Sequence, residues 1–330
     1  MIAGVVLLGF IAQVAATPHA DMLESWKRRD VWQQPDRIIA ALEVSPGDVV
    51  ADLGSGRGYF THRFADAVGP TGRVIALDAE EKGLAKVIDY AVERGVLNIE
   101  TRLVPSDDPT IEPNEADLIF ICRTWHYFRD RFRYAGLLRE ALGHRGRMAV
   151  IGPGKVSVPR TDRRRTNAYE VMRESEAAGM RLVAKHDFLE RDFFVVLEGG
   201  RGEIYDTIDE FHYVHAELAI GTGPMTDRSL GALSERGFLS ILQLGEEEPA
   251  VAGAARRHGL TYDAVAVDDP DLLDRLAATF DDRETGIVFC FAKSLGTVID
   301  PLLMLDEAGR LPLSETERAR LYEFDSASSN

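Results

Sequence analysis

The stretch "VVADLGSGRGYF", residues Val49–Phe60, joins an apolar run to a loop with glycines at alternate positions. A strand that ends in such a loop is typical of sites where the backbone closely approaches a nucleotide. A dinucleotide fingerprint would have its third glycine at position 59, which is Tyr59, and a phosphate-binding loop would have a lysine after Gly58. Neither pattern is present, and the loop reads acid-x-Gly-x-Gly-x-Gly over Asp52–Gly58.

Strand-like and helical patterns alternate on both sides of this loop, from about residue 21 to residue 199. The strand-like runs are Asp48–Leu53, Arg73–Asp78, Asn98–Val104, Ala116–Cys122 and Arg147–Gly152. They are almost continuously hydrophobic, as expected of parallel strands covered on both faces. The alternation predicts an α/β fold with a doubly wound, Rossmann-like sheet, in which ligands lie at the carboxyl ends of the strands.

Two carboxylates flank the predicted ligand position. Asp78 ends the strand-like run that follows the loop, where a carboxylate can accept hydrogen bonds from both hydroxyls of a ribose. Asp52 places negative charge beside the glycines, which favours a cationic ligand over a pyrophosphate.

This pattern resembles the class I S-adenosylmethionine-dependent methyltransferases, whose α/β sheet has seven strands. The resemblance covers about residues 30–199 and includes a closing antiparallel hairpin within Ala178–Gly199. A turn at Gly143–Gly146 replaces the usual Pro-Gly-Gly before the fifth strand. The resemblance implies S-adenosylmethionine as cofactor. The cofactor-binding residues that it implies are Asp52, Gly54, Ser55, Gly56, Gly58, Asp78 and Asp107, the last near the adenine.

The acceptor side of the site is less defined. His126 stands where the family often carries a histidine near the methyl-transfer site, and it is interpreted either as a catalytic base or substrate contact, or as a residue that fills space beside Trp125. No Asn-Pro-Pro-Tyr type motif is present, which disfavours DNA and glutamine targets. The acceptor is expected to be a small molecule or a protein side chain. Residues Glu24–Leu42 predict an N-terminal helix that covers the cofactor or simply packs through its tryptophans.

Composition excludes several functions. The net charge of −16 argues against a nucleic-acid partner, which would require a lysine- and arginine-rich surface. The basic run Arg160–Thr166 is interpreted as a solvated segment. Cys122 and Cys290 are the two cysteines and provide neither a disulfide framework nor a zinc site, so no metal is expected. The oligomeric state is left open.

The first 16 residues are apolar and end in small residues, which predicts a signal peptide or an N-terminal anchor. The expected location is periplasmic or secreted, with the cytoplasm as the alternative. Apart from a possible anchor, no membrane association is expected. Because S-adenosylmethionine is made in the cytosol, an exported chain that uses its folds only for binding remains an alternative to an enzyme.

The pattern restarts after residues 199–202, which predicts a methyltransferase domain over residues 21–200 and a second α/β domain over residues 203–330. Cys290 is expected to end a buried strand just before a helix, whose N-terminus would lower the pKa of its thiol. The order of elements resembles the dual-specificity and tyrosine phosphatases, which implies Cys290 as nucleophile and Asp268 or Asp269 as general acid.

The phosphatase resemblance lacks its arginine, since Leu295 and Gly296 occupy the positions where it could stand. That arginine normally holds the phosphate with two parallel hydrogen bonds. We therefore expect an inactive phosphatase-like domain that binds an anion or only packs, with a cysteine-dependent hydrolase as the alternative.

Overall fold

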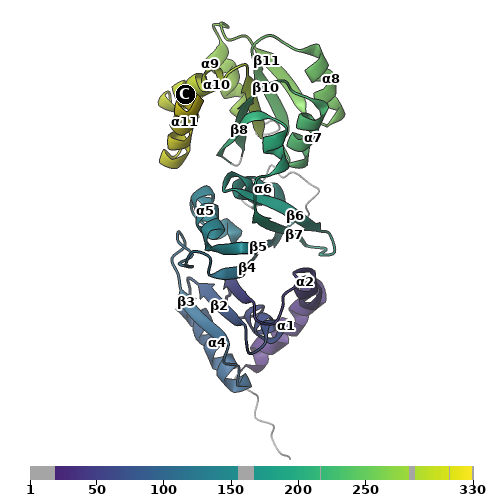
Figure 1. Ribbon diagram of the computed structural model, residues 1–330, viewed down its shortest axis with the longest axis vertical. Helices are drawn as coiled ribbons and strands as arrows, with labels where there is room; N and C mark the ends of the chain where they lie inside the picture. The colour runs from purple at the N-terminus through teal and green to yellow at the C-terminus, as the bar shows by residue number, and fades with distance from the viewer. Residues whose placement is uncertain (1–18, 155–166, 216, 282–286, 312, 329–330) are drawn as a thin grey trace, which may run out of the picture.

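The computed structural model describes residues 19–154, 167–215, 217–281, 287–311 and 313–328. The predicted signal segment and the basic run Arg160–Thr166 lie outside these ranges. Two β-sheets follow one another along the chain, each flanked by helices (Figure 1). Within the described ranges, no helix combines the length and apolar character that a bilayer crossing requires.

The first sheet has seven strands in the order β3-β2-β1-β4-β5-β7-β6. They are β1 (Val49–Leu53), β2 (Arg73–Asp78), β3 (Ile99–Leu103), β4 (Ala116–Cys122), β5 (Leu142–Pro153), β6 (Met180–His186) and β7 (Asp192–Gly199). Strands β1 to β5 are parallel, while β7 runs antiparallel to both β5 and β6. The predicted doubly wound sheet with a closing antiparallel hairpin is confirmed. Gly143–Gly146, where a turn was expected, lie within β5 but interrupt its pairing with β4, since Ala116 is opposite Leu142 and Leu118 is opposite Arg147.

Helices cover both faces of this sheet. They are α1 (Ala20–Gln33), α2 (Pro35–Ala41), α3 (Thr61–Val68), α4 (Glu81–Arg94), α5 (Arg131–Ala141) and α6 (Ala168–Ala177). Helices α5 and α6 pack on one face through Leu138 and Val171, and α1 to α3 pack on the other through residues such as Ile38 and Phe64. Strand β1 lies between β2 and β4, so the chain reverses its direction of winding there and the loop after β1 opens at the switch point.

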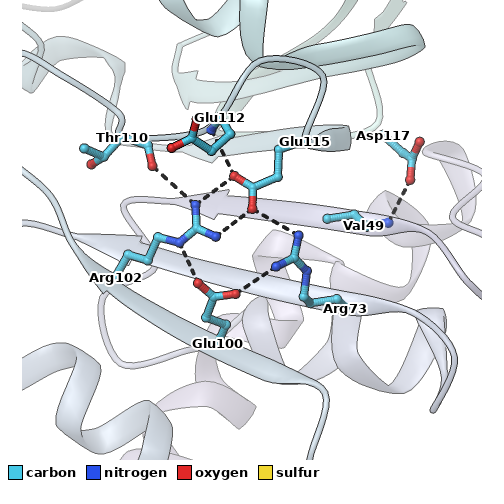
Figure 2. A network of polar contacts seen from close by, with 8 residues as sticks. All are labelled: Val49, Arg73, Glu100, Arg102, Thr110, Glu112, Glu115 and Asp117. Carbon is cyan, nitrogen blue, oxygen red and sulfur yellow. Dashed lines mark hydrogen bonds and ion pairs between the residues drawn. The ribbon is translucent and has the colours of Figure 1, made fainter.

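A network of ion pairs and hydrogen bonds joins β2, β3 and the segment just before β4, near the amino ends of β2 and β4 (Figure 2). Arg102 of β3 donates to both carboxylate oxygens of Glu115, at 2.6 and 2.8 Å, and Arg73 donates to Glu115 at 3.0 Å. Hydrogen bonding from Arg102 lowers the pKa of Glu115 to about 2, so its charge persists throughout the neutral range. The glycine loop lies at the opposite, carboxyl edge of the sheet.

The second sheet has five strands in the order β11-β10-β12-β9-β8. They are β8 (Asp209–His215), β9 (Leu218–Thr222), β10 (Ser240–Leu244), β11 (Thr261–Val265) and β12 (Val288–Ala292). All are parallel except β8, which pairs antiparallel with β9. The helices that cover this sheet are α7 (Asp227–Glu235), α8 (Pro249–Arg257), α9 (Leu272–Asp281), α10 (Leu295–Glu307) and α11 (Glu315–Ser328).

Helix α6 lies between the two sheets and carries buried charges toward the second one (Figure 1). The guanidinium of Arg236, which follows α7, donates to both carboxylate oxygens of Glu176 at 2.7 Å. The Tyr213 hydroxyl of β8 donates to the same carboxylate at 2.8 Å. This buried ion pair joins the second sheet to the helix that also packs on the first.

Candidate active site at the carboxyl edge of the first sheet

The glycine loop after β1 adopts a backbone that L side chains rarely take. Gly54, Gly56 and Gly58 have φ values of +81°, +57° and +84°. A Cβ atom at Gly54 would lie 2.1 Å from Thr124 Oγ1, so the loops that follow β1 and β4 approach each other closely. A Cβ atom at Gly56 would meet nothing within 4 Å, so the space beside this glycine is open. The alternate glycines thus allow both a tight backbone turn and an open position for a ligand.

Asp78 at the end of β2 holds this loop in place. Its Oδ2 accepts from the backbone N–H of Gly56 at 2.7 Å, and its Oδ1 accepts from that of Glu80 at 2.8 Å. Each oxygen retains a further lone pair for a ribose hydroxyl. The hydroxyl of Ser55, buried in the same loop, has no hydrogen-bond partner among the residues that the structure describes. An open position, an accessible carboxylate and an unpartnered hydroxyl fit a nucleoside-bearing cofactor such as S-adenosylmethionine.

Asp52 lies at the inner end of the loop, in β1. Its side chain is buried, and the hydroxyl of Thr61 donates to its Oδ2 at 2.6 Å. Burial raises the pKa of Asp52 to about 7, although the Thr61 hydrogen bond and the nearby Arg29 oppose this shift. A positive charge bound near this carboxyl would favour its ionised form.

Asp107 stands apart from the loop. It is exposed beyond the end of β3, and its backbone carbonyl accepts from Arg133 Nη1 at 3.0 Å. Strand β3 lies next to β2, with Leu103 opposite Asp78, so Asp107 is on the same edge of the sheet. Its contact with an adenine stays a prediction.

His126 lies in a short 3-10 helix, η1 (Trp125–Tyr127), on the segment that follows β4. The buried Trp125 anchors this helix by donating its Nε1–H to Glu174 of α6 at 2.6 Å. His126 itself is exposed, with its ring centroid 4.0 Å from that of Tyr127. Local burial, with Arg123 and Arg131 nearby, lowers the pKa of His126, so its imidazole is mostly neutral at pH 7. Thr124, two residues earlier, is the residue that approaches Gly54.

The N-terminal helix predicted over Glu24–Leu42 is present as α1 and α2, separated at Gln34, which has φ +49°. Trp26 is buried and packs edge-on against Tyr59, with their ring centroids 5.8 Å apart. Arg29 lies over the ring of Tyr59 at 4.0 Å and donates to Cys122 Sγ at 3.3 Å. Sequence reasoning missed Arg29, because nothing local distinguishes it from its basic neighbours, which face solvent.

The loop after β4 also carries Arg123, a second residue that sequence reasoning missed. It has φ +61°, a conformation that costs energy for a residue with a side chain. Its guanidinium pairs with the buried carboxylate of Asp192, at the start of β7, at 3.1 Å. Arg123 is therefore held at the carboxyl edge, next to the residue that contacts the glycine loop.

Cys290 does not occupy the position that was expected for it. Strand β12 continues two residues further, to Ala292, and Cys290 lies within the hydrophobic core with no exposed surface. Burial raises the pKa of its thiol to about 12, opposite to the expected lowering. The residue at the strand end before α10 is Ala292, which has no nucleophilic group.

A cleft of about 710 Å³ lies at the carboxyl edge of the second sheet. Its charged lining residues are Glu246, Glu247, Glu248, Asp268 and Lys293. Asp269, the other acid candidate, is paired with Arg275 at 3.2 Å. Because four carboxylates face one ammonium, the cleft does not have the charge that an anion site requires, and the expectation of anion binding is not supported there.

Residues 44–209, half of the chain, match the family described as "Methyltransferase domain". Among curated proteins, the nocamycin O-methyltransferase of Saccharothrix syringae is 31% identical over 121 residues, covering 36% of this chain and 42% of that protein. The ubiquinone/menaquinone biosynthesis C-methyltransferase of Hydrogenovibrio crunogenus is 29% identical over 135 residues, covering 41% and 50%. The aklanonic acid methyltransferase of a Streptomyces species is 26% identical over 117 residues, covering 36% and 53%. The chain spans about half the length of these relatives.

Among solved structures, a SAM-dependent methyltransferase from Aquifex aeolicus is 20% identical, with a TM-score of 0.47, and covers 53% of this chain and 96% of that one. The family match includes the glycine loop, Asp78 and all seven strands of the first sheet. The prediction of a methyltransferase fold that uses S-adenosylmethionine is confirmed. The chain belongs to the methyltransferase domain family.

Proposed function

We propose that the chain transfers the methyl group of S-adenosylmethionine, bound at the carboxyl edge of β1 and β2, to an acceptor at the end of β4. The observation that carries this proposal is the hydrogen bond from Gly56 N–H to Asp78 at 2.7 Å, in a loop whose three glycines all have positive φ. The loop is thereby held in the shape that leaves the position beside Gly56 open.

When bound, S-adenosylmethionine supplies an electrophilic methyl group. In this proposal Asp78 holds the ribose, Ser55 offers its free hydroxyl, and Asp52 favours a positive charge nearby. Catalysis comes mainly from holding the two reactants in line. His126, whose lowered pKa keeps it neutral, would accept the acceptor's proton where one must leave, or would contact the acceptor.

We favour a small-molecule acceptor over a protein side chain. The three curated relatives carry names that refer to small molecules: nocamycin, the quinones and aklanonic acid. Two of these names specify methylation at oxygen and at carbon respectively, so both acceptor atoms are compatible with the proposal.

For the second sheet we propose a phosphatase-like fold that has lost its chemistry. Four parallel strands flanked by helices, and a strand–loop–helix sequence from β12 to α10, support this proposal. The buried thiol of Cys290 counts against a cysteine-dependent hydrolase.

The apolar residues 1–16 support an exported location, and fractionation of cells with an antibody to this chain would test it.

Calorimetric titration of S-adenosylmethionine and S-adenosylhomocysteine into the protein tests the proposed cofactor site. We expect micromolar binding of both. Asp78→Asn should weaken both by about 10- to 100-fold, because charge-assisted hydrogen bonds to ribose are lost. Asp89→Asn, an exposed residue of α4 that pairs with Lys86, is the matched control and should leave binding unchanged. A folded protein that binds neither compound would contradict the proposal, and binding without transfer to any acceptor would support the binding-protein alternative.

A further inference from the structure

Three guanidinium groups surround the half-buried side chain of Trp32. Those of Arg29, Arg123 and Arg191 lie 5.9, 5.1 and 5.5 Å from its ring centroid. They come from three different places in the sequence: α1, the loop after β4, and the segment just before β7. We call these four residues the Trp32 cluster.

The Trp32 cluster carries more positive charge than its surroundings neutralise. Arg123 pairs with Asp192, which also accepts a hydrogen bond from Gln33 at 3.2 Å. Arg29 donates to Gln33 Oε1 and to Cys122 Sγ, neither of which carries a negative charge. In the part of the chain that the structure describes, no ion pair joins Arg29 or Arg191 to a carboxylate. Among the described residues, Asp192 is the one carboxylate that is ion-paired with the cluster, and Asp52, with its raised pKa, is a second carboxyl that interacts with Arg29. The chain as a whole has a net charge of −16.

The Trp32 cluster borders the proposed methyl-transfer site. Arg123 is followed directly by Thr124, the residue that a Cβ at Gly54 would strike. On the other side, Arg29 lies over the ring of Tyr59, the residue after Gly58. Both ends of the cluster therefore adjoin the glycine loop, where an acceptor would have to approach the cofactor.

We propose, resting on the methyl transfer proposed above, that Trp32, Arg123 and Arg191 bind the acceptor, and that the acceptor is a flat conjugated molecule with a negative charge, such as an aromatic carboxylate. The planar guanidinium binds a carboxylate with two parallel hydrogen bonds, which a neutral group cannot reproduce. The indole face provides a stacking surface for the conjugated ring. Excess positive charge at the mouth of a site also attracts anions from solution.

Calorimetry with two probes of the same ring tests the charge requirement. 2-Naphthoate and 2-naphthamide are titrated into the full chain, with and without saturating S-adenosylhomocysteine. We expect the carboxylate to bind about tenfold more tightly than the amide. Arg191→Gln should reduce this preference about fivefold without affecting folding, because Arg191 is exposed and forms no ion pair with the residues that the structure describes. Trp32→Leu should weaken both probes.

Arg37→Gln is the matched control, since its guanidinium lies 4.3 Å from the centroid of another aromatic ring, that of Phe188, rather than beside that of Trp32. It should leave both probes unchanged. Because Arg123→Gln alone would leave Asp192 buried and unpaired, the double variant Arg123→Gln/Asp192→Asn is used, and it should also lower the preference for naphthoate.

Equal affinity for the two probes, absence of naphthoate binding, or equal losses in Arg191→Gln and Arg37→Gln would overturn the proposal. S-Adenosylhomocysteine titrated alone separates this result from the proposed function. If S-adenosylhomocysteine does not bind, the proposed cofactor site is contradicted. The preference for naphthoate over naphthamide, measured in its absence, would still show whether the ligand at Trp32 is an anion.

Discussion

The carboxyl edges of the two sheets can be compared directly, because both sheets are mainly parallel and flanked by helices. The first edge has a glycine loop with positive φ values, a carboxylate that orders the loop, and a cluster of arginines. The second edge has a cleft lined by four carboxylates and one lysine, and the strand that leads to α10 ends in Ala292. The fold thus provides a ligand-binding edge in both halves, but the residues placed there decide which edge carries chemistry.

The substitution Gly54→Ala is expected to have the largest effect, on both stability and cofactor binding. The new Cβ would lie 2.1 Å from Thr124 Oγ1, at a φ of +81° that alanine rarely adopts. We expect a loss of about 3–6 kcal/mol in the free energy of unfolding, from strain and overpacking together, and loss of cofactor binding. Urea unfolding and titration of S-adenosylhomocysteine measure the two effects.

The control for this substitution lies in the second half. Gly253 is inside α8, and a Cβ there would meet nothing within 4 Å. Gly253→Ala should stabilise the protein by about 0.5–1 kcal/mol because alanine favours the helix. Similar destabilisation by both substitutions would contradict the steric account of the loop.

The junction between the halves gives the next largest effect. Glu176→Gln removes the charge that Arg236 pairs with, and leaves a buried guanidinium uncompensated. We expect a loss of about 3–5 kcal/mol in unfolding free energy. The exposed pair between Glu203 and Arg228 offers the control, since Glu203→Gln should leave the free energy of unfolding nearly unchanged. A small effect at Glu176 would mean that the two sheets do not depend on this pair.

The pH dependence of the first edge follows from Asp52. Burial raises the pKa of this carboxyl from 3.8 to about 7, so the folded state holds its proton more tightly than the unfolded state does. Its contribution to stability is full below about pH 4 and is lost as the pH rises to about 7. Asp52→Asn, which does not titrate, should therefore become more stable relative to the wild type over this range, as measured by urea unfolding.

Ionisation of Asp52 should also change the affinity for the cofactor. It lowers the stability of the fold but should strengthen the preference for S-adenosylmethionine. Ionised Asp52 favours the positively charged S-adenosylmethionine over the uncharged sulfur of S-adenosylhomocysteine. Between about pH 6 and pH 8 the preference for S-adenosylmethionine should increase about fivefold, and Asp52→Asn should abolish this change. A preference that is independent of pH in the wild type would show that Asp52 does not sense the ligand's charge.

The smallest effect is expected for alkylation of Cys290, which lies two residues before the end of β12 in the second sheet. Cys290 has no exposed surface and a thiol pKa raised to about 12, so iodoacetamide at about pH 8 should not alkylate it in the folded protein. Mass spectrometry of the peptide that contains Cys290 measures the modification, and urea-unfolded protein, where reaction should be complete, is the control. Rapid alkylation of the folded protein would restore the second edge as a candidate for thiol chemistry.

The sequence predicted the first edge better than the second, and the reason lies in particular residues. Gly54, Gly56 and Gly58 all have positive φ values, which glycine adopts more easily than other residues. Such a requirement concerns each residue's own backbone, so it is visible in the sequence as a spacing of glycines. Cys290 was misplaced because the length of a buried strand depends on its neighbours. Strand β12 runs on to Ala292 because Phe291 and Ala292 pair with Gly221 and Thr222 of β9.

Five strands of the first sheet, the position of the glycine loop and the carboxylate at the end of β2 were predictable from the sequence, since hydrophobic periodicity and glycine spacing are properties of short segments. The closing hairpin that completes the seven strands was expected from the family resemblance. The sequence did not predict that Arg29, Arg123 and Arg191 meet at Trp32, or that Glu176 binds Arg236. These contacts depend on the tertiary structure. These side chains come from segments far apart in the chain, and no local pattern indicates their partners. Charge clusters of this kind exist only once the sheets have assembled.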